Sequence, residues 1–155
     1  MTPIGPEDIA REHIDAQLCK AGWTIQDVCA VNLHAARGVA IRQFPLRTGH
    51  GFADYLLYVD ARAIGVIEAK REGTTLTGVE IQSEKYRQGF PDNLPAWRKP
   101  LPFCYQSTGK ETRFSNYLEP DTASRQVFAF HRPEALLSMI PAPESMGVVA
   151  ACTGG

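Results

Sequence analysis

The sequence predicts an α/β fold in which helices flank a mixed central β-sheet. Apolar residues recur at helical spacing near the amino terminus, whereas residues 52–70 contain two adjacent strand-like segments. Farther along the chain, a helical pattern separates further strand-like segments, and this alternation is typical of α/β domains. The 155 residues, of which 44% are hydrophobic, are enough for one domain with a sizeable core.

The first helix is predicted over residues 6–22. Pro6 suits the first helical position, and the acidic residues that follow it suit the positive end of the helix dipole. Apolar side chains then recur every three or four residues, at Ala10, Ile14, Leu18 and Ala21. We expect Gly22 to end the helix.

Three strands are predicted next, over residues 39–46, 52–60 and 63–70. Pro45 closes the first of them, because proline cannot donate to a β-ladder. A tight turn joins the other two. We expect Val59 to pair with Ala63 across a three-residue loop.

The remaining elements are a helix over residues 78–88, a strand over 102–108, a charged connection, a strand over 125–131 and a short helix over 133–140. The helix between two strands permits one parallel crossover. Residues 1–137 are therefore expected to form one domain. Residues 138–155 are expected to be a linker or tail.

Composition excludes several classes of protein. The 16 Lys and Arg residues nearly balance 17 Asp and Glu, so any nucleic-acid surface must be a local patch. No apolar run approaches the roughly 20 residues of a membrane span. The four cysteines lack metal-ligand spacing and are expected to be free thiols of a cytoplasmic protein. Glycine-rich phosphate-binding and dinucleotide-binding motifs are absent from the sequence.

Two strands carry acidic residues among apolar ones. If Val59 pairs with Ala63, Asp54 lies opposite Glu68, with Cβ atoms about 5 Å apart. The period of a strand also places Glu68 and Lys70 on the same face. A turn one residue shorter would separate the two acids.

Acids near strand ends are more often a solvated edge than a site. Here, however, Asp54 stands within FADYLL, and Glu68 follows AIGVI, so both interrupt core-like strands. Two neighbouring carboxylates in such surroundings need a compensating positive charge. Lys70 can supply one, and a divalent ion with oxygen ligands can offset both.

The order of these motifs resembles a known family. DYLLYV, AIGVIEAKREG and the following QSEKY, with VAIRQFPL upstream, are similar to the amino-terminal nuclease domain of type I restriction enzyme R subunits. That domain is a member of the PD-(D/E)xK nuclease superfamily, and the resemblance covers about residues 7–137. It implies a restriction-endonuclease-like core and Mg²⁺-dependent cleavage of DNA, with Mn²⁺ as a substitute ion.

The resemblance also implies roles for individual residues. Asp54 and Glu68 correspond to the metal ligands, and Lys70 to the residue that activates the attacking water. Gln82 and Tyr86 correspond to a QxxxY pair that borders the active site. Some members add an acid from the first helix, which is here Glu7 or Glu12; Glu7 is preferred because it shares a face with the apolar stripe.

Three basic residues are candidates for contacts with the DNA backbone: Lys85, Arg87 and Lys99. The implied partners are double-stranded DNA, motor domains, and the specificity and methylation subunits of a restriction complex. No membrane partner is expected. No motor is present in this sequence, so we expect no ATPase activity from it.

Ala53 replaces the proline of the superfamily name. The alternatives are a non-cleaving module that binds DNA or a partner subunit, and a stand-alone nuclease.

Overall fold

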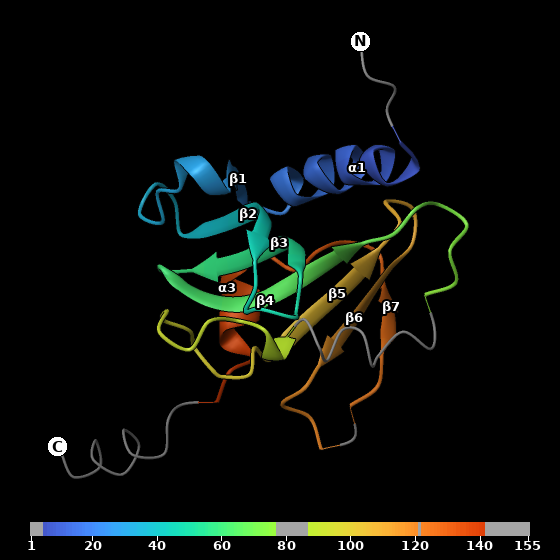
Figure 1. Ribbon diagram of the computed structural model, residues 1–155. Helices are drawn as coiled ribbons and strands as arrows, with labels where there is room; N and C mark the ends of the chain where they lie inside the picture. Colours follow the sequence, from blue (N-terminus) through green and yellow to red (C-terminus); the bar gives the residue numbers. More distant parts are fainter. Residues whose placement is uncertain (1–4, 77–86, 121, 142–155) are drawn as a thin grey trace, which may run out of the picture.

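A computed structural model describes residues 5–76, 87–120 and 122–141 (Figure 1). The described strands form one sheet whose order follows the chain, from β1 to β7. Their bounds are β1 Thr24–Asp27, β2 Gly38–Pro45, β3 Phe52–Val59, β4 Arg62–Ala69, β5 Phe103–Ser107, β6 Thr112–Asn116 and β7 Arg125–Val127. The β1–β2 and β4–β5 pairs are parallel and the other pairs are antiparallel. The predicted mixed sheet flanked by helices is therefore confirmed.

Helices α1 (Pro6–Lys20) and α3 (Pro133–Ser138) pack on one face of the sheet, and a 3-10 turn, η1 (Val28–Ala30), follows β1. Ile14, Leu18 and Leu136 of the two helices share a core cluster with Tyr55 and Leu57 of β3. This cluster fixes the position of α1 over the strands.

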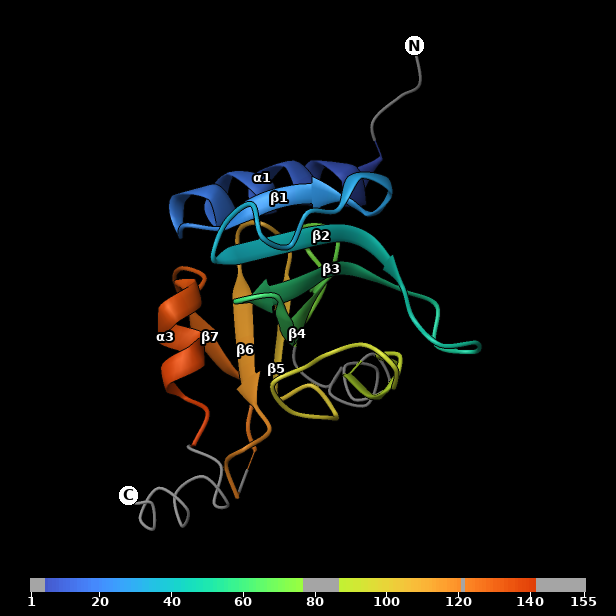
Figure 2. The ribbon, with the colours of Figure 1, turned by 90° about the vertical axis from the view of Figure 1, so that its left-hand side faces the viewer.

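The opposite face of the sheet is covered by the segment from residue 87 to 101. Phe90 and Leu101 of this segment pack in a second cluster with Leu56 of β3 and Val66 of β4. Figure 2 shows the segment across the sheet from α3. The central strands are thus buried on both sides, which agrees with the nearly continuous burial of β3 and β4.

Most predicted elements are confirmed, namely α1, β2, β3, β4, β5 and α3. The strand predicted over residues 125–131 is present only at its start, because β7 ends at Val127. The prediction missed β1, a four-residue polar strand at the sheet edge, and β6, which lies in the charged connection. Of the helix predicted over residues 78–88, only residues 87 and 88 fall in the described part, and they are helical. Cys19, Cys29 and Cys104 are free thiols, as expected. No helix in the described ranges combines the length and apolarity that crossing a bilayer requires.

The β3–β4 turn corrects one prediction. Val59 pairs with Arg62 rather than Ala63, so the loop has two residues. These residues, Asp60 and Ala61, have φ values of 51° and 66°. Two successive positive φ values are typical of a type I′ turn, which matches the twist of a hairpin.

A β-bulge in β4 offsets the shorter turn. Tyr58 pairs with Ala63 and Leu57 with Gly65, which leaves Ile64 as an extra residue. Beyond the bulge, the pairing returns to the register that the sequence predicted. The paired positions end at Tyr55 and Ile67, so Asp54 and Glu68 are each the next residue beyond the ladder.

Candidate active site

Asp54 lies at an irregularity shared by β2 and β3. The β2–β3 ladder skips the rung at which Gln43 would face Asp54. Gln43 has a φ of 52°, which is uncommon for a residue of its type. Ala53 and Leu56 lie in the same core cluster although they are three residues apart, so strict alternation fails around Asp54. The irregularity thus turns Asp54 out of the regular pleat.

The carboxylate of Asp54 joins β4 to α1. Its Oδ2 accepts a hydrogen bond of 2.9 Å from the backbone N–H of Ala69, the residue between Glu68 and Lys70. Its Oδ1 accepts bonds of 2.7 Å and 3.2 Å from Nη2 and Nε of Arg11. The Asp54 side chain is only 16% exposed. These contacts hold a carboxylate against the backbone between the other two candidate residues.

Glu68 and Lys70 form an ion pair at the carboxyl end of β4. Lys70 Nζ lies 2.6 Å from Glu68 Oε2, and the Glu68 side chain is 3% exposed. Ala69 packs in the core cluster beneath α1, as alternation along a strand requires. Glu68 and Lys70 therefore share a face. The ion pair also offsets the cost of burying the Glu68 charge.

Helix α1 is fixed to the sheet by further polar contacts. Tyr55 Oη donates to Asp15 Oδ1 at 2.6 Å, and Arg42 Nη2 donates to Asp15 Oδ2 at 2.7 Å. Burial raises the pKa of Tyr55, and its bond to Asp15 raises it further. The two hydrogen bonds to Asp15 connect α1, and Arg11 with it, to β3 and β2.

Arg11 is the cation that the sequence reasoning missed. Burial lowers the pKa of Arg11, but its hydrogen bonds and charge interactions with Asp54 and Asp8 leave that pKa raised. The sequence did contain a signal for Arg11, because its spacing puts it on the helix face that packs on the sheet. Ile14, Asp15 and Leu18 follow it by three, four and seven residues and share that face. What the sequence could not show was that this face meets Asp54.

The donor atoms of the site suit a hard divalent cation. Mg²⁺ is commonly held by one or two carboxylates together with water and substrate phosphates. Asp54 and Glu68 provide two such carboxylates on neighbouring strands. Within the described ranges, no three His, Cys, Asp or Glu side chains form a metal-binding group.

The remaining predicted site residues are distributed as follows. Arg87 and Lys99 line one cavity on the opposite side of the sheet from α1. Glu7 belongs to the first turn of α1, and Glu12 is exposed on the same helix. The side chain of Glu7 and the residues Gln82, Lys85 and Tyr86 lie outside the described part, so their roles stay predictions.

A family model and a curated relative both match this chain, and both concern the same type of protein. Residues 30–140 match the family described as the second domain of the type I restriction enzyme EcoKI endonuclease subunit. The EcoKI endonuclease subunit of Escherichia coli strain K12 is 30% identical over 182 aligned positions, which cover 86% of this chain. The chain spans only 16% of the length of that relative. The region that matches the family model, residues 30–140, includes Asp54, Glu68 and Lys70 but not Arg11.

A solved structure supports the same fold. It is a fragment described as an HsdR subunit of a type I restriction enzyme from Vibrio vulnificus YJ016. The structures superpose with a TM-score of 0.60 at 20% sequence identity, over 89% of this chain and 25% of the other. The resemblance to R subunits is thus confirmed, and the chain belongs to the endonuclease-subunit family of type I restriction enzymes.

Proposed function

We propose that this domain is a Mg²⁺-dependent endonuclease that hydrolyses phosphodiester bonds of DNA within a type I restriction enzyme. Family membership supports a role related to restriction endonucleases. The observation that carries the proposal is the hydrogen bond from the Ala69 backbone to Asp54. It holds one carboxylate at the backbone between Glu68 and Lys70, the two other residues that metal-assisted hydrolysis needs.

Each residue of the site has a distinct role in this proposal. Asp54 and Glu68 would hold Mg²⁺, which when bound polarises the phosphoryl group and makes its bound water more acidic. Lys70 places an ammonium group beside Glu68, where it orients the attacking water and stabilises negative charge on the phosphate. Arg11 fixes the orientation of Asp54 through Oδ1.

The surroundings of the site strengthen these charge interactions. Glu68 is almost fully buried, and Lys70 is only 20% exposed. Charges fixed in such a poorly solvated place interact more strongly than charges in water, and they need no rearrangement during the reaction. The positive φ of Gln43 is consistent with this role, because strained backbone often occurs at functional sites.

The proposed partners follow from the family. The substrate is double-stranded DNA, and the remaining parts of the enzyme are motor domains and the specificity and methylation subunits. ATP hydrolysis is assigned in this proposal to the motor domains and not to this nuclease domain.

A second candidate function is a module that binds DNA or a partner subunit without cleaving DNA. One observation favours it: Asp54 and Glu68 are each paired with a cation, at 2.7 Å and 2.6 Å, so their charges are compensated by the protein itself. In the nuclease, a metal ion would take over part of the charge compensation that Arg11 and Lys70 provide. In the binding module, these two ion pairs would stay as they are.

Nicking of supercoiled plasmid with Mg²⁺ or Mn²⁺ tests the proposal. Asp54→Asn keeps an acceptor for the Ala69 N–H but removes the charge, and Lys70→Met keeps the aliphatic stem. Asp60→Asn and Lys110→Ala are matched controls, since both residues form exposed ion pairs, with Arg37 and Glu72 respectively. Circular dichroism confirms that each variant is folded.

We expect the parent protein and both controls to nick the plasmid. EDTA, Asp54→Asn and Lys70→Met should each abolish nicking. Nicking that survives both site substitutions would reject this site. A folded parent that binds DNA but does not nick it, alone or within the whole subunit, would favour the binding module.

A further inference from the structure

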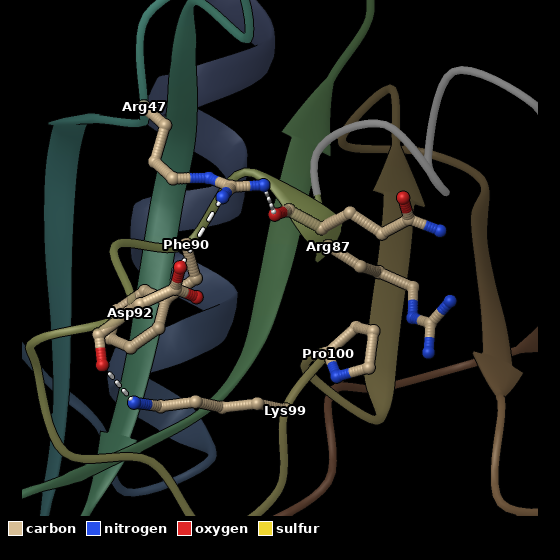
Figure 3. A pocket seen from close by; sticks show the side chains of 7 residues that line it. Arg47, Arg87, Phe90, Asp92, Lys99 and Pro100 are labelled. Carbon is tan, nitrogen blue, oxygen red and sulfur yellow. Dashed lines mark hydrogen bonds and ion pairs between the residues drawn. The ribbon is translucent and has the colours of Figure 1, made fainter.

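A basic cavity lies on the sheet face opposite α1 (Figure 3). Its volume is about 280 Å³. Three basic side chains and one acidic one line it, together with aromatic and proline side chains. We call it the Arg47 pocket, and its residues are Arg47, Arg87, Gln88, Phe90, Asp92, Lys99 and Pro100.

The β2–β3 loop is held against the segment that carries Arg87. The backbone N–H of Arg47 donates to the carbonyl of Gly89 at 2.8 Å. A Cβ added at Gly89 would lie 2.6 Å from Cβ of His50, so glycine is required for this close approach. Arg47 and Arg87, distant in sequence, are thereby brought to one pocket before any ligand binds.

Arg87 is fixed in orientation on its side of the pocket. The residue is 7% exposed, and its Nε donates to the carbonyl of Leu101 at 2.6 Å. Its guanidinium carbon lies 3.7 Å from the centre of the Tyr117 ring. A guanidinium held in this way presents its charge with little loss of side-chain entropy.

Asp92 is the acidic residue among those that line the pocket. Arg47 Nη1 lies 3.4 Å from Asp92 Oδ2, a long contact between side chains that are 45% and 82% exposed. Lys99 Nζ donates to the Asp92 backbone carbonyl at 2.5 Å. An exposed ion pair of this kind adds little stability. Another anion can therefore displace the Asp92 carboxylate at low cost while Lys99 remains beside it.

We propose that the Arg47 pocket binds a phosphate of the DNA backbone, which replaces the Asp92 carboxylate as the anionic partner of Arg47. The Nη2 atom of Arg47 also donates to the carbonyl of Gln88 at 2.9 Å, and this bond holds the guanidinium in the pocket. Arginine and lysine are the usual donors to DNA phosphates, and arginine can bind two phosphate oxygens at once. The loop that carries Arg47 continues directly into β3, the strand of Asp54. A phosphate held here would fix the position of the duplex relative to the candidate active site, so this proposal deepens the proposed function.

Fluorescence anisotropy of a short labelled duplex tests the pocket at several salt concentrations. All proteins carry Asp54→Asn and the buffer contains EDTA, so binding is measured without cleavage. The test variants are Arg47→Gln, Lys99→Gln and Asp92→Asn. Arg37→Gln and Asp60→Asn are the controls, because Arg37 and Asp60 form an exposed pair at 3.2 Å at the other end of the β2–β3 hairpin.

We expect Arg47→Gln and Lys99→Gln each to weaken binding about fivefold and to lower the salt-dependence slope by about one. Asp92→Asn should strengthen binding, because it removes the competing anion. The controls should change affinity less than twofold. Test variants that behave like the controls would overturn the proposal.

Isothermal titration with inorganic pyrophosphate distinguishes DNA from a small anion as the ligand. Pyrophosphate binding that Arg47→Gln abolishes, without any effect on DNA binding, would overturn the assignment to the DNA backbone. Pocket-dependent DNA binding by a protein that never nicks plasmid would reject the proposed nuclease and retain the pocket.

Discussion

The Oδ2 atom of Asp54 accepts a hydrogen bond from the backbone N–H of Ala69 across the β3–β4 pair. The regular pairing of these strands ends at Tyr55 and Ile67. A side chain therefore continues the connection between the strands where the backbone ladder stops. Because Arg11 binds the other oxygen, the orientation of this carboxylate depends on both α1 and β4.

We predict a measurable coupling between Arg11 and Asp54. Their side chains are 26% and 16% exposed, so solvent screens the pair less than a surface pair. A double-mutant cycle with Arg11→Ala and Asp54→Ala should give a coupling of about 1–2 kcal/mol in urea unfolding. The Arg37–Asp60 pair, with side chains 53% and 43% exposed, should give less than about 1 kcal/mol. Equal couplings would contradict the prediction.

Ala61→Gly is predicted to stabilise the protein. Ala61 has a φ of 66°, a left-handed conformation that costs a residue with a Cβ roughly 1–2 kcal/mol. Part of this gain is lost because glycine has more freedom in the unfolded chain, so the net increase in unfolding free energy should be about 0.5–1 kcal/mol. Ala40→Gly, in the interior of β2, is the control and should be destabilising. Urea unfolding checks both signs.

Substitutions at Gln43 should separate backbone strain from side-chain effects. The φ of 52° is accessible to glycine but poorly tolerated by β-branched residues. Gln43→Val should therefore be less stable than Gln43→Gly by about 1–2 kcal/mol. Thermal unfolding of both variants measures the difference. Equal stability would mean that the backbone at this position is not constrained.

His131 is predicted to make stability depend on pH. Burial lowers its pKa, and the charge of Arg125 lowers it further. The unfolded state therefore binds a proton more readily, so this contribution is present above the ordinary pKa of His, about 6.5, and is lost as pH falls below it. Protonation also removes the acceptor at Nδ1 that the Tyr105 hydroxyl, 2.5 Å away, can use.

Melting temperatures of the parent protein and His131→Gln between pH 8 and pH 5 test this dependence. The parent should lose more stability on acidification than the variant. Parallel pH profiles would show that His131 does not contribute.

The order of the core elements could be predicted because their apolar patterns are strong. Strands β3 and β4 are buried along nearly their whole length, and α1 has a clear apolar stripe. Strand β6 could not be predicted in this way, since its buried residues include Thr112, Ser115 and Asn116. The hydroxyls of Ser107 and Thr112 bond at 2.8 Å, and such pairing is invisible in a hydrophobicity pattern.

The candidate site was predictable in its strand residues and not in its helix residue. Glu68 and Lys70 are two positions apart on one strand, so their common face follows from geometry alone. The contact of Arg11 with Asp54 depends on how α1 is placed on the sheet, which packing decides. The convergence of Arg47 with Arg87 likewise depends on the loop contact at Gly89.

The short turn and the bulge at Ile64 have a consequence for sequence variation among relatives. The turn has one residue fewer than the sequence suggested, and the bulge adds one residue to β4. A single insertion in the turn, or a single deletion at the bulge, would shift Glu68 by one position relative to Asp54. Relatives that keep both acids should therefore change length at these two places together, and an alignment should show paired gaps rather than isolated ones.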